Sequence, residues 1–275
     1  MALAPRTVTV YQRDGALREL LTKITSCRPV ASLTEAERSF FKAAQDGDYV
    51  LATQETVFHP QGGGQPSDTG TITSTEHSGK ETTFQVKLVR KLPEDRILHH
   101  GSFVGSPEKP TFDDGDTVLQ TIDNEKRNYH SRLHTAGHII GLAVRQLADS
   151  IPNVTELKAN HAPDSAFVEF KGLIDGQHKP TIQKKATDLV LQNLPVGVRW
   201  WDEEKMRAHC TAVPDAVSMP EDGLIRVVEV EGVGAYPCGG THLPTTQDIG
   251  GIVVRRISRQ KGITKISYSI TDKPQ

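Results

Sequence analysis

Two short motifs, far apart in the sequence, constrain this chain more than any other feature. HTAGH occupies residues 134–138, and CGGTH occupies residues 238–242. Each motif places two side chains of the metal-ligand type at positions i and i+4, so their union is three imidazoles and one thiolate. This donor set suits zinc. The fold would have to bring the two motifs together for one ion to be held.

The first motif lies in a segment with helical periodicity. Apolar residues recur at steps of three and four over residues 129–148, which predicts a helix with one buried stripe. Asp123 and Asn124 are good N-cap residues for that helix. Because residues four apart share a helix face, His134 and His138 can hold one ion together.

The second motif lies among glycines and a proline, which predict a tight turn between strands. Glycines there would let the backbone approach an ion or a substrate. Either pair alone could be two ordinary side chains that bind nothing. The two pairs together match the ligand preferences of zinc. His130, one turn before His134, could be a third ligand, a partner of a ligand, or a solvated residue.

Composition places the chain among globular proteins, with 36% hydrophobic and 24% charged residues. Its 275 residues fit one large or two moderate domains. No long apolar run predicts a membrane span, and residues 1–13 lack the apolar core of a signal peptide, so we expect a cytoplasmic protein. The three cysteines, Cys27, Cys210 and Cys238, are too few and too scattered to predict a disulfide framework.

The net charge of −2 gives no support to strong nonspecific binding of nucleic acid, although a local basic patch remains compatible with it. One such cluster lies near the C-terminus. A solvated face is the plain alternative for it. Its members are Arg255, Arg256, Arg259, Lys261 and Lys265.

Short strands separated by Gly and Pro turns predict a small barrel or sandwich up to about residue 120, with a local helix at residues 39–44. Beyond the histidine helix, helices and antiparallel strands mix, which predicts an α+β domain. The strands are expected at 155–159, 166–170, 198–201, 225–230, 251–257 and 263–270, and the helices at 181–194 and 202–208.

A glycine-rich loop, HPQGGGQPSDTG, occupies residues 59–70. It is no Walker-type phosphate loop, because no Gly-Lys-Ser or Gly-Lys-Thr follows it. It could be a plain β-turn. Alternatively, its bare backbone and the Gln65 amide could face a ligand.

These three motifs together resemble the editing domain of alanyl-tRNA synthetase, and most closely its freestanding relatives of the AlaX family, the medium-length type. The resemblance covers nearly the whole chain and includes residues 219–223 and 248–251. It implies an α+β protein with an N-terminal glycine-motif β-barrel, residues 1–120. This barrel would be joined to a zinc-binding editing core with an antiparallel sheet, residues 121–275.

The resemblance also implies an activity, the zinc-dependent deacylation of alanine tRNA charged with serine or glycine. The partner would be that aminoacylated tRNA, with no membrane and no obligate protein partner. One zinc ion per chain would be held by His134, His138, Cys238 and His242. Four protein ligands would close a tetrahedral site. We therefore hypothesise that Cys238 is the weakest ligand and that Gln65 orients the water or the substrate carbonyl.

A pocket that distinguishes serine from alanine should pair with a hydroxyl. Ordinary strand or turn roles are the alternative for each candidate. The candidates are Thr56, Thr155, Asn160 and His161, with Gly63 and Gly64 supplying backbone. The C-terminal basic cluster becomes a candidate contact to tRNA phosphates.

Three rival functions remain. A metal-dependent amidase or peptidase would be expected to carry HExxH, but Thr135 occupies the position of its glutamate. A non-catalytic zinc protein that binds RNA would need a closed site. Editing of another mischarged tRNA, such as serine-charged threonine tRNA, is the third alternative, because the threonyl-tRNA synthetase editing domain carries a related zinc pattern.

Overall fold

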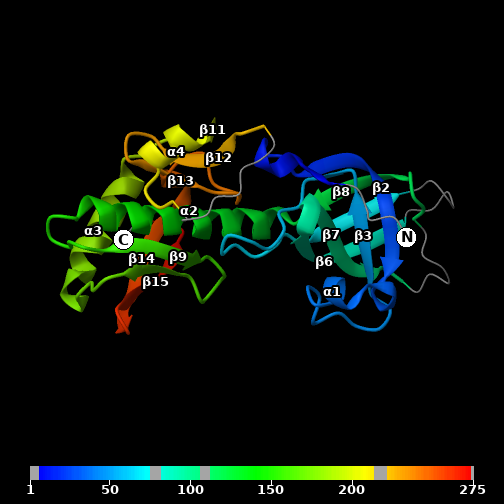
Figure 1. Cartoon of the computed structure of the whole chain (residues 1–275), viewed down its shortest axis with the longest axis horizontal. Coiled ribbons are helices and arrows are strands. Elements are labelled where there is room, and N and C mark those ends of the chain that lie inside the picture. The colour runs from blue at the N-terminus through cyan, green and yellow to red at the C-terminus, as the bar shows by residue number, and fades with distance from the viewer. Residues whose placement is uncertain (1–5, 75–81, 106–111, 214–221, 274–275) are drawn as a thin grey trace. The chain divides into compact units, whose positions relative to one another are not determined.

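The computed structural model describes residues 6–74, 82–105, 112–213 and 222–273 (Figure 1). The chain divides into two compact units. The first unit comprises residues 1–62 and 66–127, and the second comprises 63–65 and 128–275. The three residues from Gly63 to Gln65 thus group with the second unit, although both flanking segments belong to the first.

The first unit is built on a closed barrel of six strands, which confirms the expected small barrel. Buried residues alternate with more exposed ones along the strands Thr82–Leu92 and Thr117–Ile122, and Ile72, Phe84 and Val86 are among the side chains that fill the core. A short parallel pair, β1 (Val8–Thr9) with β4 (Glu55–Thr56), lies outside the barrel sheet. In their order around the barrel the strands are β2 (Glu19–Pro29), β3 (Tyr49–Thr53), β7 (Arg96–Phe103), β6 (Thr82–Leu92), β5 (Gly70–Ser74) and β8 (Thr117–Ile122).

The helix expected at residues 39–44 is wrong. The helix of this region is α1 (Glu35–Arg38), which starts at Thr34 with a capping box, because the Thr34 and Glu37 side chains each bond the other residue's amide. After α1 the backbone makes single turns, such as Phe41 N–H to the Arg38 carbonyl, instead of continuing a helix. The remaining one-turn segments are 3-10 helices: η1 (Val10–Gln12), η2 (Val30–Ser32), η3 (Pro93–Asp95), η4 (Gly176–His178) and η5 (Gln247–Ile249).

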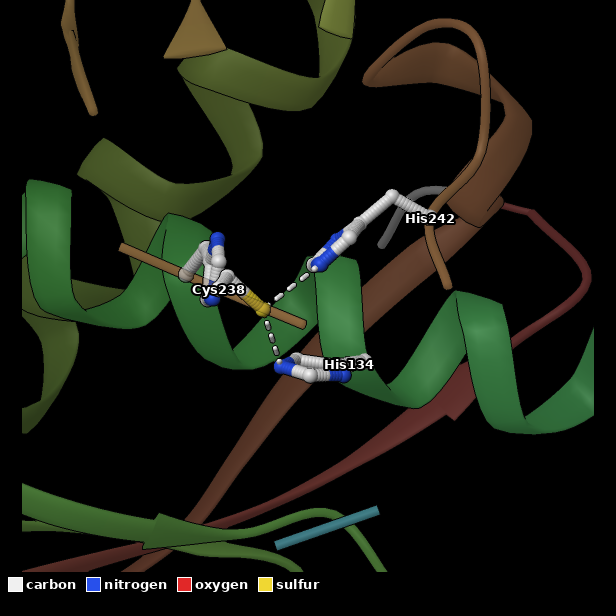
Figure 2. Close-up of side chains that lie close together, drawn as sticks. His134, Cys238 and His242 are labelled. Carbon is white, nitrogen blue, oxygen red and sulfur yellow. Dashed lines mark hydrogen bonds between the residues drawn. The ribbon is translucent and has the colours of Figure 1, made fainter. Parts of the chain in front are cut away.

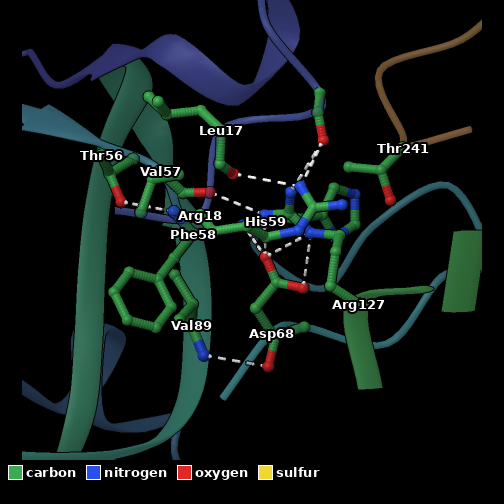
Figure 3. Close-up of polar contacts among 12 residues, drawn as sticks. Leu17, Arg18, Thr56, Val57, Phe58, His59, Asp68, Val89, Arg127 and Thr241 are labelled. Carbon is green, nitrogen blue, oxygen red and sulfur yellow. Dashed lines mark hydrogen bonds and ion pairs between the residues drawn. The ribbon is translucent and has the colours of Figure 1, made fainter. Parts of the chain in front are cut away.

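A buried ion pair holds the base of the glycine-rich loop in the first unit (Figure 3). The Arg127 guanidinium donates to both oxygens of Asp68 and to the Val57 carbonyl, and both charged side chains are fully buried. Asp68 also accepts the His59 amide at 2.6 Å, and its own amide donates to the His59 carbonyl. Charge-assisted bonds of this kind offset the cost of burying the two charges. These bonds fix His59 and Asp68, and the three glycines of the loop lie between these two residues in the sequence.

The second unit is organised around α2 (Asn124–Gln146), which starts at the expected cap, since the Asp123 carboxylate accepts the Lys126 amide. Within this unit α2 lies between two antiparallel sheets (Figure 1). Gly141 permits the close packing, because a Cβ there would lie 2.2 Å from the Glu156 carboxylate and 2.3 Å from the Tyr236 hydroxyl.

The two sheets and two further helices of this unit follow the predicted pattern and confirm the α+β class. The four-stranded sheet has the order β14 (Gly251–Gln260), β15 (Ile263–Thr271), β10 (Phe167–Lys171), β9 (Thr155–Asn160). The three-stranded sheet has the order β11 (Val196–Trp201), β12 (Ile225–Val230), β13 (Gly234–Pro237). The helices are α3 (Lys179–Leu191) and α4 (Glu203–His209).

No helix in the described part of the chain has the length and apolar character needed to cross a membrane. The three cysteines all lie in that part, and none forms a disulfide.

Candidate metal centre

The structure brings the four expected ligands together. One donor atom from each of His134, His138, Cys238 and His242 lies within 4.8 Å of the donor atoms of the others. The Cys238 thiol is 3.4 Å from Nε2 of His134 and 3.3 Å from Nε2 of His242 (Figure 2). The rings of His134 and His138 lie 5.0 Å apart, as expected for two residues one turn apart on α2. This cluster could hold a metal ion.

Local geometry explains why the second motif reaches the helix. Strand β13 ends at Pro237, so Cys238 begins the loop that follows it. Gly240 then passes against the helix, since a Cβ there would lie 2.3 Å from a ring carbon of His134. The Gly240 amide donates to the Cys238 thiol at 3.4 Å. Gly240 therefore allows a close approach of this loop to the His134 ring.

Hydrogen bonds fix the proton positions of two imidazoles. The Gln65 Oε1 atom is only an acceptor, so Nδ1 of His134, 2.7 Å away, must donate to it. The amide orientation of Gln65 follows because the same oxygen accepts the Thr241 N–H at 3.0 Å. The Thr135 hydroxyl donates its proton to the Ser131 carbonyl, so it accepts from Nδ1 of His242. Both rings thus carry their proton on Nδ1, and their Nε2 atoms keep the lone pair that could bind a metal.

The Nε2 atoms of His134 and His242 both face the Cys238 sulfur, at 3.4 Å and 3.3 Å. Nδ1 of His138 is also buried, with no hydrogen-bond partner among the described residues. A cation among these donors would satisfy converging lone pairs, and acceptors on the outer ring nitrogens are usual for histidine ligands of metals.

Burial keeps the His138 imidazole neutral, the form in which an imidazole binds metal. Burial lowers the pKa of His138 to about 3, and the neighbouring His161 and Arg226 add to this decrease. Burial lowers the pKa of His161 to about 3 as well. Burial raises the pKa of the Cys238 thiol, while the Gly240 amide and the Arg226 guanidinium act against this increase.

Gln65 lies against the ligands and is 1% exposed. Its Oε1 accepts two hydrogen bonds, and its Nε2 donates to the Thr241 hydroxyl at 2.8 Å. The Thr241 hydroxyl in turn lies 2.7 Å from that of Ser131 on α2. The amide that we expect to orient water or substrate therefore already orients His134.

His161 is the other expected site residue that reaches the cluster. Its ring stacks on that of His134, with centroids 4.1 Å apart. The Tyr268 hydroxyl donates to the Leu133 carbonyl, so Nδ1 of His161 donates to that hydroxyl at 2.7 Å. The His161 amide donates to the carbonyl of Gly64.

The two glycines proposed to supply backbone differ in their surroundings. Gly64 has φ +79°, and a Cβ there would lie 2.4 Å from the Ala159 carbonyl oxygen, so the position requires glycine. Gly63 has φ +57° and open space around it. Gly64 therefore lets the end of the loop pack closely against β9. The backbone of Gly63 remains accessible.

Two polar candidates of the second unit have other surroundings, and a third belongs to the first unit. Thr155 is exposed at the start of β9, and the Asn160 amide donates to the carbonyl and hydroxyl of Ser165. Thr56 belongs to the first unit, where its buried hydroxyl bonds His99.

The predicted basic cluster occupies the hairpin of β14 and β15. Arg255, Arg256 and Lys261 are exposed there. Arg259 forms an ion pair with Asp175 at 3.3 Å, and Lys265 pairs with Glu169 at 3.3 Å and lies over the Phe167 ring. Two of the five cations are thus partly neutralised.

Sequence reasoning missed Arg226, which is 8% exposed and donates to the carbonyl of Cys238. An arginine inside the apolar strand IRVVEV is the signal that could have revealed it, because a buried guanidinium needs partners. His130 is buried, which excludes a solvated role at the helix start. Residues 219–221 of the motif at 219–223 lie outside the described residues.

Comparisons with known proteins agree with this geometry. Residues 225–267, which include Cys238 and His242, match the family model of the threonyl and alanyl tRNA synthetase second additional domain. The chain is 28% identical over 237 residues to the alanine–tRNA ligase of Methanosphaera stadtmanae, covering 82% of this chain and 24% of the ligase. It spans about a quarter of the length of such ligases.

Two shorter relatives match over more of their own length. An AlaX-L alanyl-tRNA editing protein of Pyrococcus horikoshii is 26% identical over 268 residues, covering 94% of this chain and 57% of the relative. An AlaX-M alanyl-tRNA editing protein of Methanosarcina barkeri is 33% identical over 248 residues, covering 87% of this chain and 96% of the relative. With this identity over nearly the whole of that relative, the chain belongs to the AlaX family of alanyl-tRNA editing proteins.

Proposed function

We propose that this chain is a zinc-dependent deacylase that edits mischarged alanine tRNA, removing serine and possibly glycine. The observation that carries the proposal is the convergence of four zinc-type donors, three imidazoles and one thiol, whose donor atoms lie within 4.8 Å of one another. The family supports the substrate class, since its members are named for editing alanyl-tRNA.

The site chemistry suits an aminoacyl ester, which is already activated toward water. Hydrolysis then needs a positioned water and stabilisation of the developing oxyanion more than it needs a strong nucleophile. His134, His138, Cys238 and His242 would hold the zinc ion. When bound, zinc would supply Lewis acidity toward the ester carbonyl and toward water.

The protein groups around the cluster have two tasks in this proposal. Gln65 and Thr135 hold the rings of His134 and His242 with their Nε2 atoms toward the thiol. Gln65 has a second Nε2–H beyond its bond to Thr241, and this proton is the one we assign to the attacking water or the substrate carbonyl. Cys238 would be the most readily displaced ligand.

The substrate contacts extend this proposal. His161 would meet the amino acid at the cluster, with Gly63 and Gly64 supplying backbone. Thr56, Thr155 and Asn160 remain candidates for pairing with the serine hydroxyl. We also propose that the barrel domain comprises residues 1–120, that the editing domain comprises 121–275, and that the protein acts in the cytoplasm.

The test is deacylation of purified alanine tRNA charged with serine, with glycine or with alanine. We expect loss of serine or glycine while alanine survives, and no loss with a Cys238→Ala variant or after chelation. Serine-charged threonine tRNA belongs in the same assay, because the matching family model covers both threonyl and alanyl synthetases. Absence of turnover by folded, zinc-loaded protein would favour a non-catalytic RNA-binding role.

The basic hairpin is proposed as a tRNA-binding surface. Exchange of Arg255 and Arg256 for Ala should weaken binding and reduce the slope of log affinity against log salt by about 1 for each phosphate that the variant no longer neutralises. The control is Lys184→Ala, since that ammonium pairs with Asp188 on α3. A slope equal to that of the control would assign the two arginines to an ordinary solvated face.

A further inference from the structure

A single row of residues crosses the three-stranded sheet and ends at the metal centre. Trp200 on β11 lies directly opposite Arg226 on β12. Arg226 lies opposite Cys238, because the Cys238 amide donates to its carbonyl at 3.1 Å and its guanidinium donates back to the Cys238 carbonyl. Directly opposed residues share a face of an antiparallel sheet. Trp200, Arg226 and Cys238 therefore form a continuous line.

The two tryptophans of the chain have different surroundings. Trp201 faces the opposite side of the sheet, is 8% exposed, and packs with Met206 of α4. Trp200, its neighbour, is 39% exposed. Trp200 is a large, partly exposed aromatic residue that stands opposite Arg226 in the sheet. It is continuous with the site at which the ester would be cleaved.

The spacing of this row fits the end of an RNA. Neighbouring strands lie about 4.8 Å apart, so the Trp200 backbone is about 10 Å from that of Cys238. An aminoacyl ester on a terminal ribose would place its own nucleobase within a similar reach. Aromatic rings recognise unpaired bases by stacking, and arginine supports such contacts to RNA.

We propose that Trp200 is a stacking platform for the unpaired 3′-terminal nucleobase of the RNA, with Arg226 linking this subsite to the metal centre. The inference rests on the proposed function, because it takes the cleaved ester to lie on an RNA 3′ end. It adds a residue that contacts the base. It also explains why a tryptophan is exposed at this edge of the sheet.

The test uses the fact that the chain has two tryptophans. A Trp201→Phe variant reports the fluorescence of Trp200 alone, and a Trp200→Phe variant reports that of Trp201 alone. The probe is an uncharged RNA hairpin with the alanine acceptor stem and an unpaired 3′ end, compared with the same hairpin lacking its terminal adenosine. Circular dichroism checks that both variants fold.

The full hairpin should quench Trp200 strongly, and the shortened hairpin should quench it less. The emission of Trp201 should hardly change with either. Trp200→Ala should weaken binding of the full hairpin by about tenfold, and Trp200→Phe, which keeps a ring, should restore most of the affinity.

Equal quenching of Trp200 by both hairpins would contradict the proposal that Trp200 stacks on the terminal nucleobase. Unchanged Trp200 emission would also overturn it, and the proposed function would stand if the same protein still deacylated its substrate. Quenching that depends on the terminal adenosine, without deacylation, would support the platform and count against the proposed editing activity instead.

Discussion

His99 of the first unit and the histidine cluster of the second are buried in different ways. In the barrel, Nδ1 of His99 donates to the Leu51 carbonyl and its Nε2 accepts the Thr56 hydroxyl, so both ring nitrogens are satisfied by oxygen. In the second unit, His134 and His242 each direct an unprotonated Nε2 at one sulfur. Burial alone is thus a poor sign of a metal site. The convergence of four metal-type donors is a better one.

The largest effect should come from removing a ligand. His138→Asn should reduce the zinc content from about one ion per chain to a small fraction and abolish deacylation, since a zinc site depends on its full donor set. The matched barrel variant is His100→Asn, whose ring bonds Asp48. It should retain zinc. Metal analysis of the two purified proteins measures the difference, and equal zinc contents would remove the distinction between the two units.

Removal of the metal should destabilise one unit and spare the other. A ligand present at a thousand times its dissociation constant stabilises the folded state by about 4 kcal/mol. Chelation should therefore speed amide hydrogen exchange in the central turns of α2, around Leu142, and leave strand β7 of the barrel unchanged. Exchange that rises equally in both units would contradict a metal centre confined to the second.

Two buried glutamines allow a direct test of ligand orientation. Gln65 makes three hydrogen bonds next to the metal centre, and Gln120 makes three in the barrel, to Val57, Thr53 and Glu55. Gln65→Ala should weaken zinc binding by about 10- to 100-fold, because it frees the His134 ring. Gln120→Ala should cost about 1–3 kcal/mol of stability without altering zinc affinity. Zinc titration with a competing chelator separates the two, and equal affinities would exclude the orienting role.

The smallest effect concerns pH. Burial lowers the pKa of His99 to about 4, and the bond to the Leu51 carbonyl opposes this shift. Because the unfolded chain takes up the proton first, stability should fall as the pH drops below about 6.5, by about 2 kcal/mol between pH 7 and pH 5. His99→Gln should flatten this dependence. Urea unfolding of the metal-free protein and of the metal-free variant at pH 7 and pH 5 measures the change in unfolding free energy. An equal change in both proteins would show that His99 is not responsible.

Periodicity predicted much of the fold, because several elements have local signals. Helix α2 shows its cap at Asp123 and its apolar stripe, and β12 coincides with the run at residues 225–230. Strand β2 was missed, since residues 17–24 mix polar and apolar types and gain their role from pairing with β3 and β8. A helix was expected at residues 39–44, but the helix of this region is α1 (Glu35–Arg38). It starts at one capping box, which a count of apolar residues does not detect.

The candidate site also combines features that are local in the sequence with features that depend on the tertiary fold. The spacing of His134 and His138 is local, so a helix suffices to predict that they share a face. The bonds that orient the ligand rings join residues far apart in the chain, such as Gln65 with His134 and Thr135 with His242. Only the tertiary fold makes these neighbours. A strand pattern also says nothing of register, which decides which side chain stands beside Cys238.

The grouping of Gly63, Gly64 and Gln65 with the second unit has a consequence for dissecting this protein. A fragment of residues 128–275 would keep the four metal-type donors and the sheets, yet it would lack the amide that sets the proton of His134. Such a fragment would keep the candidate metal ligands but lose the hydrogen bond from His134 to Gln65. The barrel region cannot be removed without loss, because residues 63–65 lie between its segments in the sequence. One of these residues, Gln65, bonds the candidate ligand His134.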